Sequence, residues 1–322
     1  MDVTIQIQNI LSGAGNYIHG RDSDDDTGVT YASIVEWKED IGMTFSYGTC
    51  RNNQRQHATR QQWYKTGYDY WENELNCPAT VDGVLGGFAI LSKRDLEGSS
   101  DFMRYLKSTI RPKLKLTQED NDGIPTRACE CGAGKLYFGV VPWDPIGHHL
   151  INFRQPTTCD VPDRVTKGLL LPLGVTHCDL VEPSPRLISS APDYLGEKSA
   201  KCRYFCQGLQ DFEPKEHTYD IIWIQWVIGY LTDDDLVDFL KRCAVGLRRG
   251  GVVVIKDNTC EQEAFIVDRD DASSTRSLPY ILAIAELAGL RVVYQRFQED
   301  FPTNIFPVPI IALEPRLSGD CS

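Results

Sequence analysis

The second half of the chain alternates short apolar runs with longer segments in which apolar residues recur at the helical period. A run that is apolar throughout, such as residues 251–255, is typical of a strand in a parallel sheet that helices cover on both faces. The helical segment that begins at Thr232 has three aspartates in its first turn, where they favour a helix N-terminus. The last two strand-like runs adjoin without a helix, so they should pair antiparallel. Strands are expected at residues 127–131, 177–182, 202–207, 219–225, 251–257, 290–297 and 306–313.

This order of elements predicts an α/β fold, a Rossmann-like sheet of about seven strands that binds ligands at the carboxyl ends of its strands. We assign residues 61–322 to this domain and expect residues 63–115 to form an N-terminal helical lid. Residues 1–60 contain an acidic, turn-rich stretch at 20–28 and a polar stretch at 50–62 that follows neither period. We therefore expect residues 1–60 to be a flexible N-terminal segment.

Charge and composition narrow the class of partner. The net charge of −12 argues against nucleic acid or an anionic membrane, because their phosphates would be repelled. No apolar run approaches the roughly 20 residues that span a bilayer, and the first residues lack the pattern of a signal peptide. The 11 cysteines are scattered, so we expect reduced, buried thiols and no metal site. His148 and His149 would point to opposite sides of a strand and are not read as a metal pair. These features indicate a cytoplasmic protein.

One short stretch has the composition of a cofactor-binding loop. An expected strand leads into Gly132-Ala133-Gly134, and the following strand ends in Glu182, where an acid can accept hydrogen bonds from ribose hydroxyls. Gly134 and Glu182 are about 50 residues apart, whereas such an acid usually follows the glycines by about 20. Removal of residues 135–161 would restore the usual spacing and would join the glycines to a helix start that carries Arg164.

Three interpretations of residues 135–161 stay open. The segment is a structured loop above the cofactor, a disordered insert that leaves the site intact, or a retained intron that is translated in frame. We favour the retained intron, because the segment has no hydrophobic period and interrupts a loop that is normally short. If the segment is present, we expect Arg164 to miss its ligand and the affinity for the cofactor to fall.

Four blocks of sequence resemble the protein α-N-terminal methyltransferases: TVDGVLGGF at 80–88, GLQDF at 208–212, YDIIWIQWVIGYLTD at 219–233 and VIKDN at 254–258. The resemblance covers residues 63–134 and 162–316 and leaves residues 1–60 and 135–161 without a counterpart. This family uses S-adenosylmethionine (AdoMet) to methylate the free α-amine of proteins that begin Xaa-Pro-Lys. The resemblance implies a class I methyltransferase fold, AdoMet as cofactor and protein N-termini, including those of ribosomal proteins, as substrates. It also implies a monomer in the cytoplasm and the nucleus.

The resemblance places a cofactor site on individual residues. Glycines would let backbone amides approach the methionyl part of AdoMet. Arg164 would pair with the methionyl carboxylate through its planar guanidinium, and Glu182 would accept from the ribose hydroxyls. The implied cofactor residues are Gly132, Gly134, Arg164, Glu182, Leu209, Gln210 and Gln225.

The resemblance also implies a substrate site. The α-amine, with a pKa of about 8, must lose a proton before it attacks the methyl group, and Asp271 is the candidate to orient the amine and take that proton. Asp268 would pair with the lysine at the third substrate position, and Asn258 would hydrogen-bond the first peptide units. Family members commonly have a histidine where this chain has Tyr230, and a tyrosine with a pKa of about 10 is a poor base at neutral pH. The implied substrate residues are Trp71, Leu85, Leu91, Trp226, Asp268, Ile305 and Phe306, and the implied catalytic residues are Tyr230, Asn258 and Asp271.

The sequence thus predicts an enzyme that methylates the α-amine of Xaa-Pro-Lys N-termini. Two alternatives stay open. One is an AdoMet-dependent enzyme that acts on another amine. The other is a protein that binds N-termini but is inactive, because its cofactor loop is interrupted.

Overall fold

The main sheet has seven strands in the order β10-β11-β7-β6-β3-β4-β5. The computed structural model describes residues 2–23, 29–41, 50–78, 85, 88–117, 119, 121–132 and 164–316, with side chains omitted for 50–58. The five strands from β7 to β5 are parallel, and β11 pairs antiparallel with both β7 and β10. The sequence prediction of a Rossmann-like sheet with an antiparallel final pair is therefore confirmed. The strands are β3 (Arg127–Cys131), β4 (His177–Val181), β5 (Cys202–Phe205), β6 (Tyr219–Gln225), β7 (Leu247–Lys256), β10 (Leu290–Phe297) and β11 (Pro309–Pro315).

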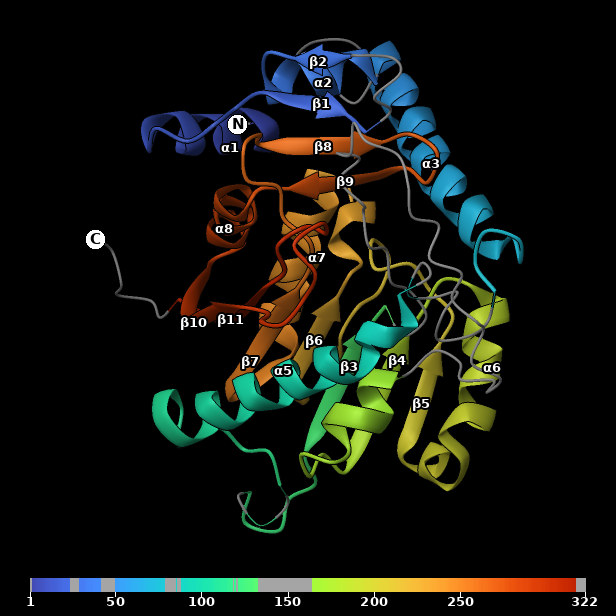
Figure 1. Ribbon diagram of the computed structural model, residues 1–322, viewed down its shortest axis with the longest axis vertical. Coiled ribbons are helices and arrows are strands. Elements are labelled where there is room, and N and C mark those ends of the chain that lie inside the picture. The colour runs from blue at the N-terminus through green and yellow to red at the C-terminus, as the bar shows by residue number, and fades with distance from the viewer. Residues whose placement is uncertain are drawn as a thin grey trace.

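Both faces of this sheet are buried under helices (Figure 1). All seven residues of β6 are buried, and successive side chains enter opposite cores, Ile222 in one and Trp223 in the other. Helices α7 (Asp233–Gly246) and α8 (Leu278–Leu287) cover one face. The other face carries α5 (Ser92–Tyr105), η2 (Leu106–Ile110), η3 (Thr166–Leu170) and α6 (Pro185–Leu195), which η4 (Gly196–Lys201) follows. Among the described residues, no helix is long and apolar enough to cross a membrane.

The N-terminal segment differs from the flexible stretch that we expected over residues 1–60. Its described parts form α1 (Val3–Gly13), β1 (Gly20–Asp22), β2 (Thr30–Tyr31) and α2 (Ile34–Asp40). The side chain of Asp2 caps α1, and that of Ser33 caps α2. Ile7 and Trp37 are buried in the same core as α7 and α8. Strands β1 and β2 have three and two residues, too few to show a hydrophobic period, which explains why the sequence pattern did not reveal them.

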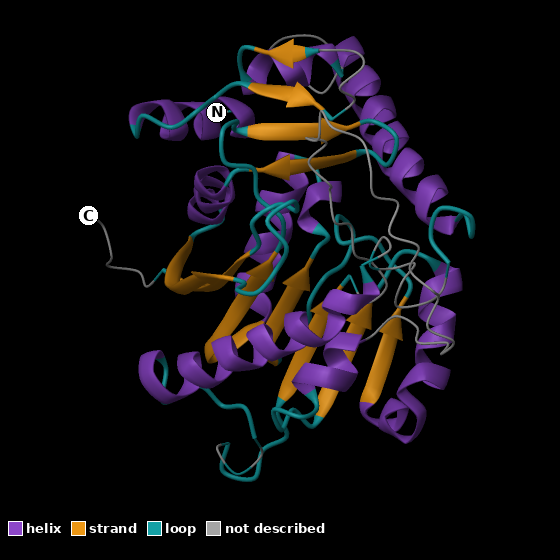
Figure 2. Cartoon of the chain, in the orientation of Figure 1, coloured by secondary structure: helices purple, strands orange, loops and turns teal. Residues whose placement is uncertain are grey.

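Strands β1 and β2 belong to a second sheet of four strands, in the order β2-β1-β8-β9. Strands β8 (Phe265–Asp268) and β9 (Ser273–Arg276) form an antiparallel hairpin, and β1 runs parallel to β8. Figure 2 shows this small sheet beyond the ends to which the parallel strands of the main sheet point. The small sheet therefore lies on the side of the molecule where a Rossmann-like sheet binds its ligands.

Helix α3 (Cys50–Glu72) also corrects the prediction, because it begins within the polar stretch that showed no helical period. It extends for 23 residues from beside the small sheet towards α6 (Figure 1). Of the helical lid expected at 63–115, α3 approaches the ligand side of the sheet, whereas α5 packs on the sheet face after the short η1 (Ala89–Leu91).

Candidate active site

A cavity of about 340 Å³ lies at the carboxyl ends of β3, β4 and β6. This volume is within the range of pockets that bind small molecules and cofactors. Its floor comes from the strand ends and its roof from α3, through Trp63, Tyr64 and Gly67. The sequence-predicted residues on its wall are Gly132, Glu182, Leu209, Gln210 and Tyr230.

Gly132 occupies a position that only glycine can fill. Its φ is +85°, and an added Cβ would lie 2.1 Å from Cγ1 of Val227. Its N–H donates to the carbonyl of Val181 at 3.0 Å, which fixes the end of β3 beside the end of β4. The glycine expected to begin a cofactor loop is thus in place. Gly134 and the segment at 135–161, including His148 and His149, lie outside the described residues.

Glu182 is fully buried at the end of β4 and lines the cavity. One of its carboxylate oxygens accepts from the N–H of Ser184 at 2.9 Å, and Ser184 in turn caps α6. The side chain is therefore held in one orientation at the cavity wall. A buried carboxylate in this position can accept from two neighbouring hydroxyls, which is the geometry that a ribose requires.

The turn that carries Leu209 and Gln210 is held by Arg242 of α7, a residue that the sequence analysis missed. The guanidinium donates to the carbonyls of Leu209 at 2.9 Å, Gln210 at 3.1 Å and Phe212 at 3.0 Å. These bonds satisfy three carbonyls and fix the turn against the cavity. The GLQDF block therefore lines the cavity and also forms a turn that Arg242 holds in place.

Arg164 and Gln225 take a different place from the one expected. Neither residue lines the cavity; both contact Asp95 of α5. Nη1 of Arg164 lies 2.6 Å from a carboxylate oxygen of Asp95, and Nε2 of Gln225 donates to the same carboxylate at 3.1 Å. Lys256, at the end of β7, lies 2.5 Å from its other oxygen. The structure thus brings these two predicted cofactor residues together in a buried ionic cluster whose other members, Asp95 and Lys256, the sequence analysis missed.

Charge compensation explains why this cluster can be buried. Burial alone would raise the pKa of Asp95, but Arg164 and Lys256 outweigh it and lower the pKa. Burial lowers the pKa of Lys256 to about 8, against the opposing effect of Asp95. The guanidinium carbon of Arg164 also lies 5.4 Å from the ring centre of Trp226, which places this tryptophan against the cluster.

Tyr230 and Asp271 meet although 41 residues separate them in the chain. The hydroxyl of Tyr230 donates to a carboxylate oxygen of Asp271 at 3.0 Å. Tyr230 ends the short helix η5 (Ile228–Tyr230), and Asp271 lies buried in the turn between β8 and β9. The ring of Trp71, at the end of α3, lies edge-on to Tyr230 with 5.8 Å between the ring centres. Three distant segments therefore converge at one point beside the cavity.

The predicted apolar walls also come together. Trp71, Leu85, Leu91, Trp226 and Ile305 belong to one buried cluster, and Tyr230 packs against it. Trp226 has a φ of +53°, an uncommon conformation for a bulky residue that often marks a functional site. Phe306 is half-buried and, within the described residues, does not belong to this cluster.

The two other polar residues expected at the substrate site, Asn258 and Asp268, lie at the ends of β7 and β8. Asn258 is buried after β7, and its N–H donates to Asp257 at 2.8 Å. Asp257 also accepts from the N–H of Ile228 at 3.1 Å, so it joins the end of β7 to the turn that carries Tyr230. Burial raises the pKa of Asp257 to about 7 against these backbone hydrogen bonds. The sequence analysis missed Asp257, although it stands next to Asn258.

An acidic run, Asp268 to Asp271, closes this side of the site. A carboxylate oxygen of Asp268 accepts from the N–H of Asp270 at 2.9 Å. The pKa of Tyr70 on α3 is raised by burial and then by the charges of Asp271, Asp268 and Asp270. The run therefore presents its negative charge towards the end of α3, where a cationic ligand would be attracted.

Comparisons with known proteins show what this chain is similar to. A family model described as AdoMet dependent proline di-methyltransferase matches residues 59–136 and 161–314. The N-terminal Xaa-Pro-Lys N-methyltransferase 1 of Xenopus tropicalis is 40% identical over 249 residues, which are 77% of this chain and 93% of that protein. The protein of the same name from Danio rerio is 39% identical over 253 residues, 78% of this chain and 95% of that protein.

A solved structure of a SAM-dependent methyltransferase from Leishmania major has 30% sequence identity and a TM-score of 0.68. The matched region covers 92% of this chain and 96% of the Leishmania major chain. The family model leaves residues 1–58 and 137–160 unmatched, close to the two regions that the sequence analysis left without a counterpart.

Proposed function

The chain belongs to the AdoMet dependent proline di-methyltransferase family, and on this premise we propose that it methylates the free α-amine of proteins that begin Xaa-Pro-Lys. The observation that carries the proposal is the hydrogen bond of 3.0 Å between Tyr230 and Asp271, beside a cavity whose wall includes Gly132 and Glu182. An acceptor for an amine and a site for the methyl donor are thus adjacent. The relatives named for Xaa-Pro-Lys N-methylation support the substrate class.

The described residues fit AdoMet. Gly132 gives the backbone a close approach that a Cβ would block, and Glu182 presents a fixed carboxylate for the ribose hydroxyls. Leu209 and Gln210 line the same cavity and would hold the adenine. Bound AdoMet supplies a methyl group that is already activated by its sulfonium. Arg164 and Gln225, which the sequence places at the methionyl end, contact Asp95 instead and do not line the cavity.

The chain's own residues would prepare the amine. An α-amine with a pKa of about 8 is mostly protonated at neutral pH, so a group in the site must accept its proton. Asp271 would take this role, and its hydrogen bond from the hydroxyl of Tyr230, which holds one of its oxygens, supports the assignment. Removal of the proton would free the lone pair of the nitrogen for attack, and alignment of the amine in the site would supply most of the acceleration.

Recognition of the next two residues would fall to the surrounding walls. The cluster of Trp71, Leu91 and Trp226 would pack on the proline, whose fixed φ limits the entropy lost on binding. Asp268 would pair with the lysine at the third position, and Asn258 would bond the first peptide units without adding charge. Ribosomal proteins that begin with this motif are the expected substrates, and we expect a monomer in the cytoplasm and the nucleus.

Peptides varied at the second and third positions test the proposal. With AdoMet present, we expect methyl transfer to a peptide that begins Ser-Pro-Lys. Replacement of the proline by alanine or of the lysine by glutamine should lower kcat/KM about tenfold or more, because each change removes a specific contact. Equal rates on all three peptides would indicate a different amine substrate and would contradict the proposal.

A further inference from the structure

The N-terminal segment reaches the substrate side of the molecule although it precedes the family match. Strand β1 pairs with β8 so that Asp22 stands opposite Val267, the residue before Asp268. The N–H of Ser23 donates to the carbonyl of Val267 at 2.6 Å. Figure 1 shows β1 and α2 beside the β8–β9 hairpin. The segment is thus attached to the strand that leads into the acidic run.

Arg269 is the cation within this acidic run, and its side chain is directed at the N-terminal segment. Its Nε donates to a carboxylate oxygen of Asp22 at 2.6 Å, and its Nη2 donates to Asp40 at 2.6 Å. Nη2 also donates to the hydroxyl of Tyr31. Asp22 is buried at the end of β1, and Asp40 ends α2, so both elements of the segment hold the same guanidinium.

The direction of the Arg269 side chain determines the net charge near a bound substrate. Within the described residues, the ion pairs of this guanidinium are with Asp22 and Asp40 of the N-terminal segment and not with the aspartates of its own run. A guanidinium that lost these partners would pair with a carboxylate of its own run, because its planar fork matches carboxylate geometry. It would then compete directly with the lysine and the α-amine of the substrate.

We propose that Asp22, Tyr31 and Asp40 are positioning residues for the cationic substrate, because they direct the guanidinium of Arg269 away from Asp268 and Asp271. The N-terminal segment thereby sets the affinity for the lysine at the third substrate position. The inference rests on the proposed function, since it takes the substrate to be an Xaa-Pro-Lys N-terminus. It adds to that function a specificity role for a segment that lies outside the family match.

Peptide binding by the full-length protein tests this role. Calorimetry would measure the dissociation constants of a Ser-Pro-Lys peptide and of the same peptide with norleucine in place of lysine. The variant Asp22→Asn with Asp40→Asn should bind the lysine peptide about tenfold more weakly and the norleucine peptide about twofold more weakly, because charge competition acts mainly on the lysine. The matched control, Asp193→Asn with Asp238→Asn, removes two exposed acids elsewhere and should change neither constant by more than about twofold.

Rescue separates charge competition from a loss of structure. Addition of Arg269→Gln to the double variant removes the competing cation and should return the constant for the lysine peptide to within about twofold of the unmodified protein. An equal defect in the double and triple variants, or no defect in the double variant, would overturn the inference. If the double variant is unfolded by its melting curve, Asp40→Asn alone, at a half-exposed position, and its combination with Arg269→Gln give the same comparison.

The binding assay also distinguishes this inference from the proposed function. Methyl transfer to the lysine peptide by the unmodified protein is measured separately. The shifts in binding without any transfer would refute the proposed function and keep the role of Arg269. Methyl transfer by the unmodified protein, with unchanged peptide binding in the variants, would support the proposed function and refute the role assigned to the N-terminal segment.

Discussion

At the scale of single residues, the site is built from side chains whose positions the ends of strands determine. Gly132 follows β3, Glu182 follows β4 and Asn258 follows β7. Because the carboxyl ends of parallel strands meet at one edge of a sheet, these residues lie on the ligand side of the sheet, and Gly132 and Glu182 line the cavity. Substitutions of single side chains can therefore test the cofactor end and the substrate end of the site separately.

Replacement of Glu182 by glutamine tests the cofactor end. The amide keeps the shape but loses the charge and one acceptor, and hydrogen bonds to a charged group contribute about 1.5–3 kcal/mol. We expect the dissociation constant for AdoMet to rise about ten- to a hundredfold by calorimetry. Glu197→Gln, at an exposed position of η4, is the matched control and should leave the constant unchanged. An unaltered affinity in Glu182→Gln would remove this residue from the cofactor site.

Tyr230→Phe tests the substrate end. The change removes the hydroxyl that donates to Asp271 at 3.0 Å and leaves the ring against Trp71. We expect kcat/KM for the peptide to fall about tenfold, because the proton acceptor loses its orientation. The affinity for AdoMet should stay the same. Tyr105→Phe on the exposed side of α5 serves as the control, and a rate equal to that of the unmodified protein would assign Tyr230 no role in catalysis.

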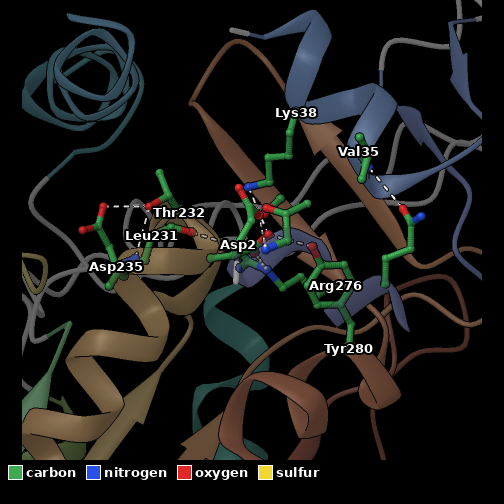
Figure 3. A network of polar contacts seen from close by, with 12 residues as sticks. Asp2, Val35, Lys38, Leu231, Thr232, Asp235, Arg276 and Tyr280 are labelled. Carbon is green, nitrogen blue, oxygen red and sulfur yellow. Dashed lines mark hydrogen bonds and ion pairs between the residues drawn. The ribbon is translucent and has the colours of Figure 1, made fainter. Parts of the chain in front are cut away.

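At the scale of helices and strands, the N-terminal segment and the start of α7 are joined by a buried ionic network. The carboxylate of Asp233 lies 3.1 Å from Nζ of Lys38 on α2, and it accepts from Arg276 at 3.0 Å and from Tyr280 at 2.7 Å. Figure 3 shows Lys38, Arg276 and Tyr280 converging from three elements. Arg276 also donates to the carbonyls of Ile228 and Leu231, at either end of the turn that carries Tyr230. The network therefore connects α2 to the active site.

Lys38→Met tests what this network contributes to stability. The change leaves a buried carboxylate with one cation fewer, and the loss of one partner from a buried ion pair costs about 3 kcal/mol. We expect the free energy of unfolding to fall by about this amount in a denaturant titration. Lys241→Met breaks an exposed pair with Asp238 and should change the free energy by less than about 1 kcal/mol. Equal effects of the two substitutions would contradict the assigned role of Lys38.

Acid should weaken the same network. Burial alone would raise the pKa of Asp233, but Lys38 and Arg276 lower it from 3.8 to about 2. A carboxyl group with a depressed pKa stabilises the fold above its unfolded pKa and loses that contribution as the pH falls through its folded pKa. We expect the stability difference between the protein and Asp233→Asn to shrink between pH 3.8 and about 2. A constant difference across this range would show that Asp233 does not carry the effect.

The sequence predicted the elements that have a clear period and missed those that depend on distant partners. Strand β6 is buried on both faces, so its apolar run was recognisable on its own. Strand β1 has three residues and pairs with β8, which follows some 240 residues later, so no local pattern reveals it. Asp95 could not be identified from the sequence either, because its partner Arg164 is distant in the chain. It lies on α5, and only the packing of that helix on the sheet brings it to Arg164.

At the scale of the whole molecule, two regions distinguish this chain from the family match, the N-terminal segment and the residues between 136 and 161. The N-terminal segment adds β1 and β2 to the second sheet at the ligand side, and ion pairs of Arg269 and Lys38 join it to the rest of the protein. The other region separates Gly132 from Arg164 in the chain and lies outside the described residues. Its interpretation as a retained intron stays a prediction.

Comparison of the full chain with a version that lacks residues 135–161 tests that prediction. The shorter protein restores the usual spacing between the glycines and the helix that carries Arg164, so we expect it to bind AdoMet about tenfold more tightly by calorimetry. Sequencing of the transcript is the direct check, and a message that encodes residues 135–161 would refute the retained intron. Equal affinities would show that the segment leaves the cofactor site intact.

Tandem mass spectrometry of a Ser-Pro-Lys peptide incubated with the protein and AdoMet tests the central claim most directly. The fragment spectrum locates each added methyl group on either the α-amine or the lysine side chain. The geometry around Asp271 and Asp268 predicts methyl groups on the α-amine alone, with the lysine serving only as a charge for recognition. Methyl groups on the lysine, or none on the peptide, would contradict the account.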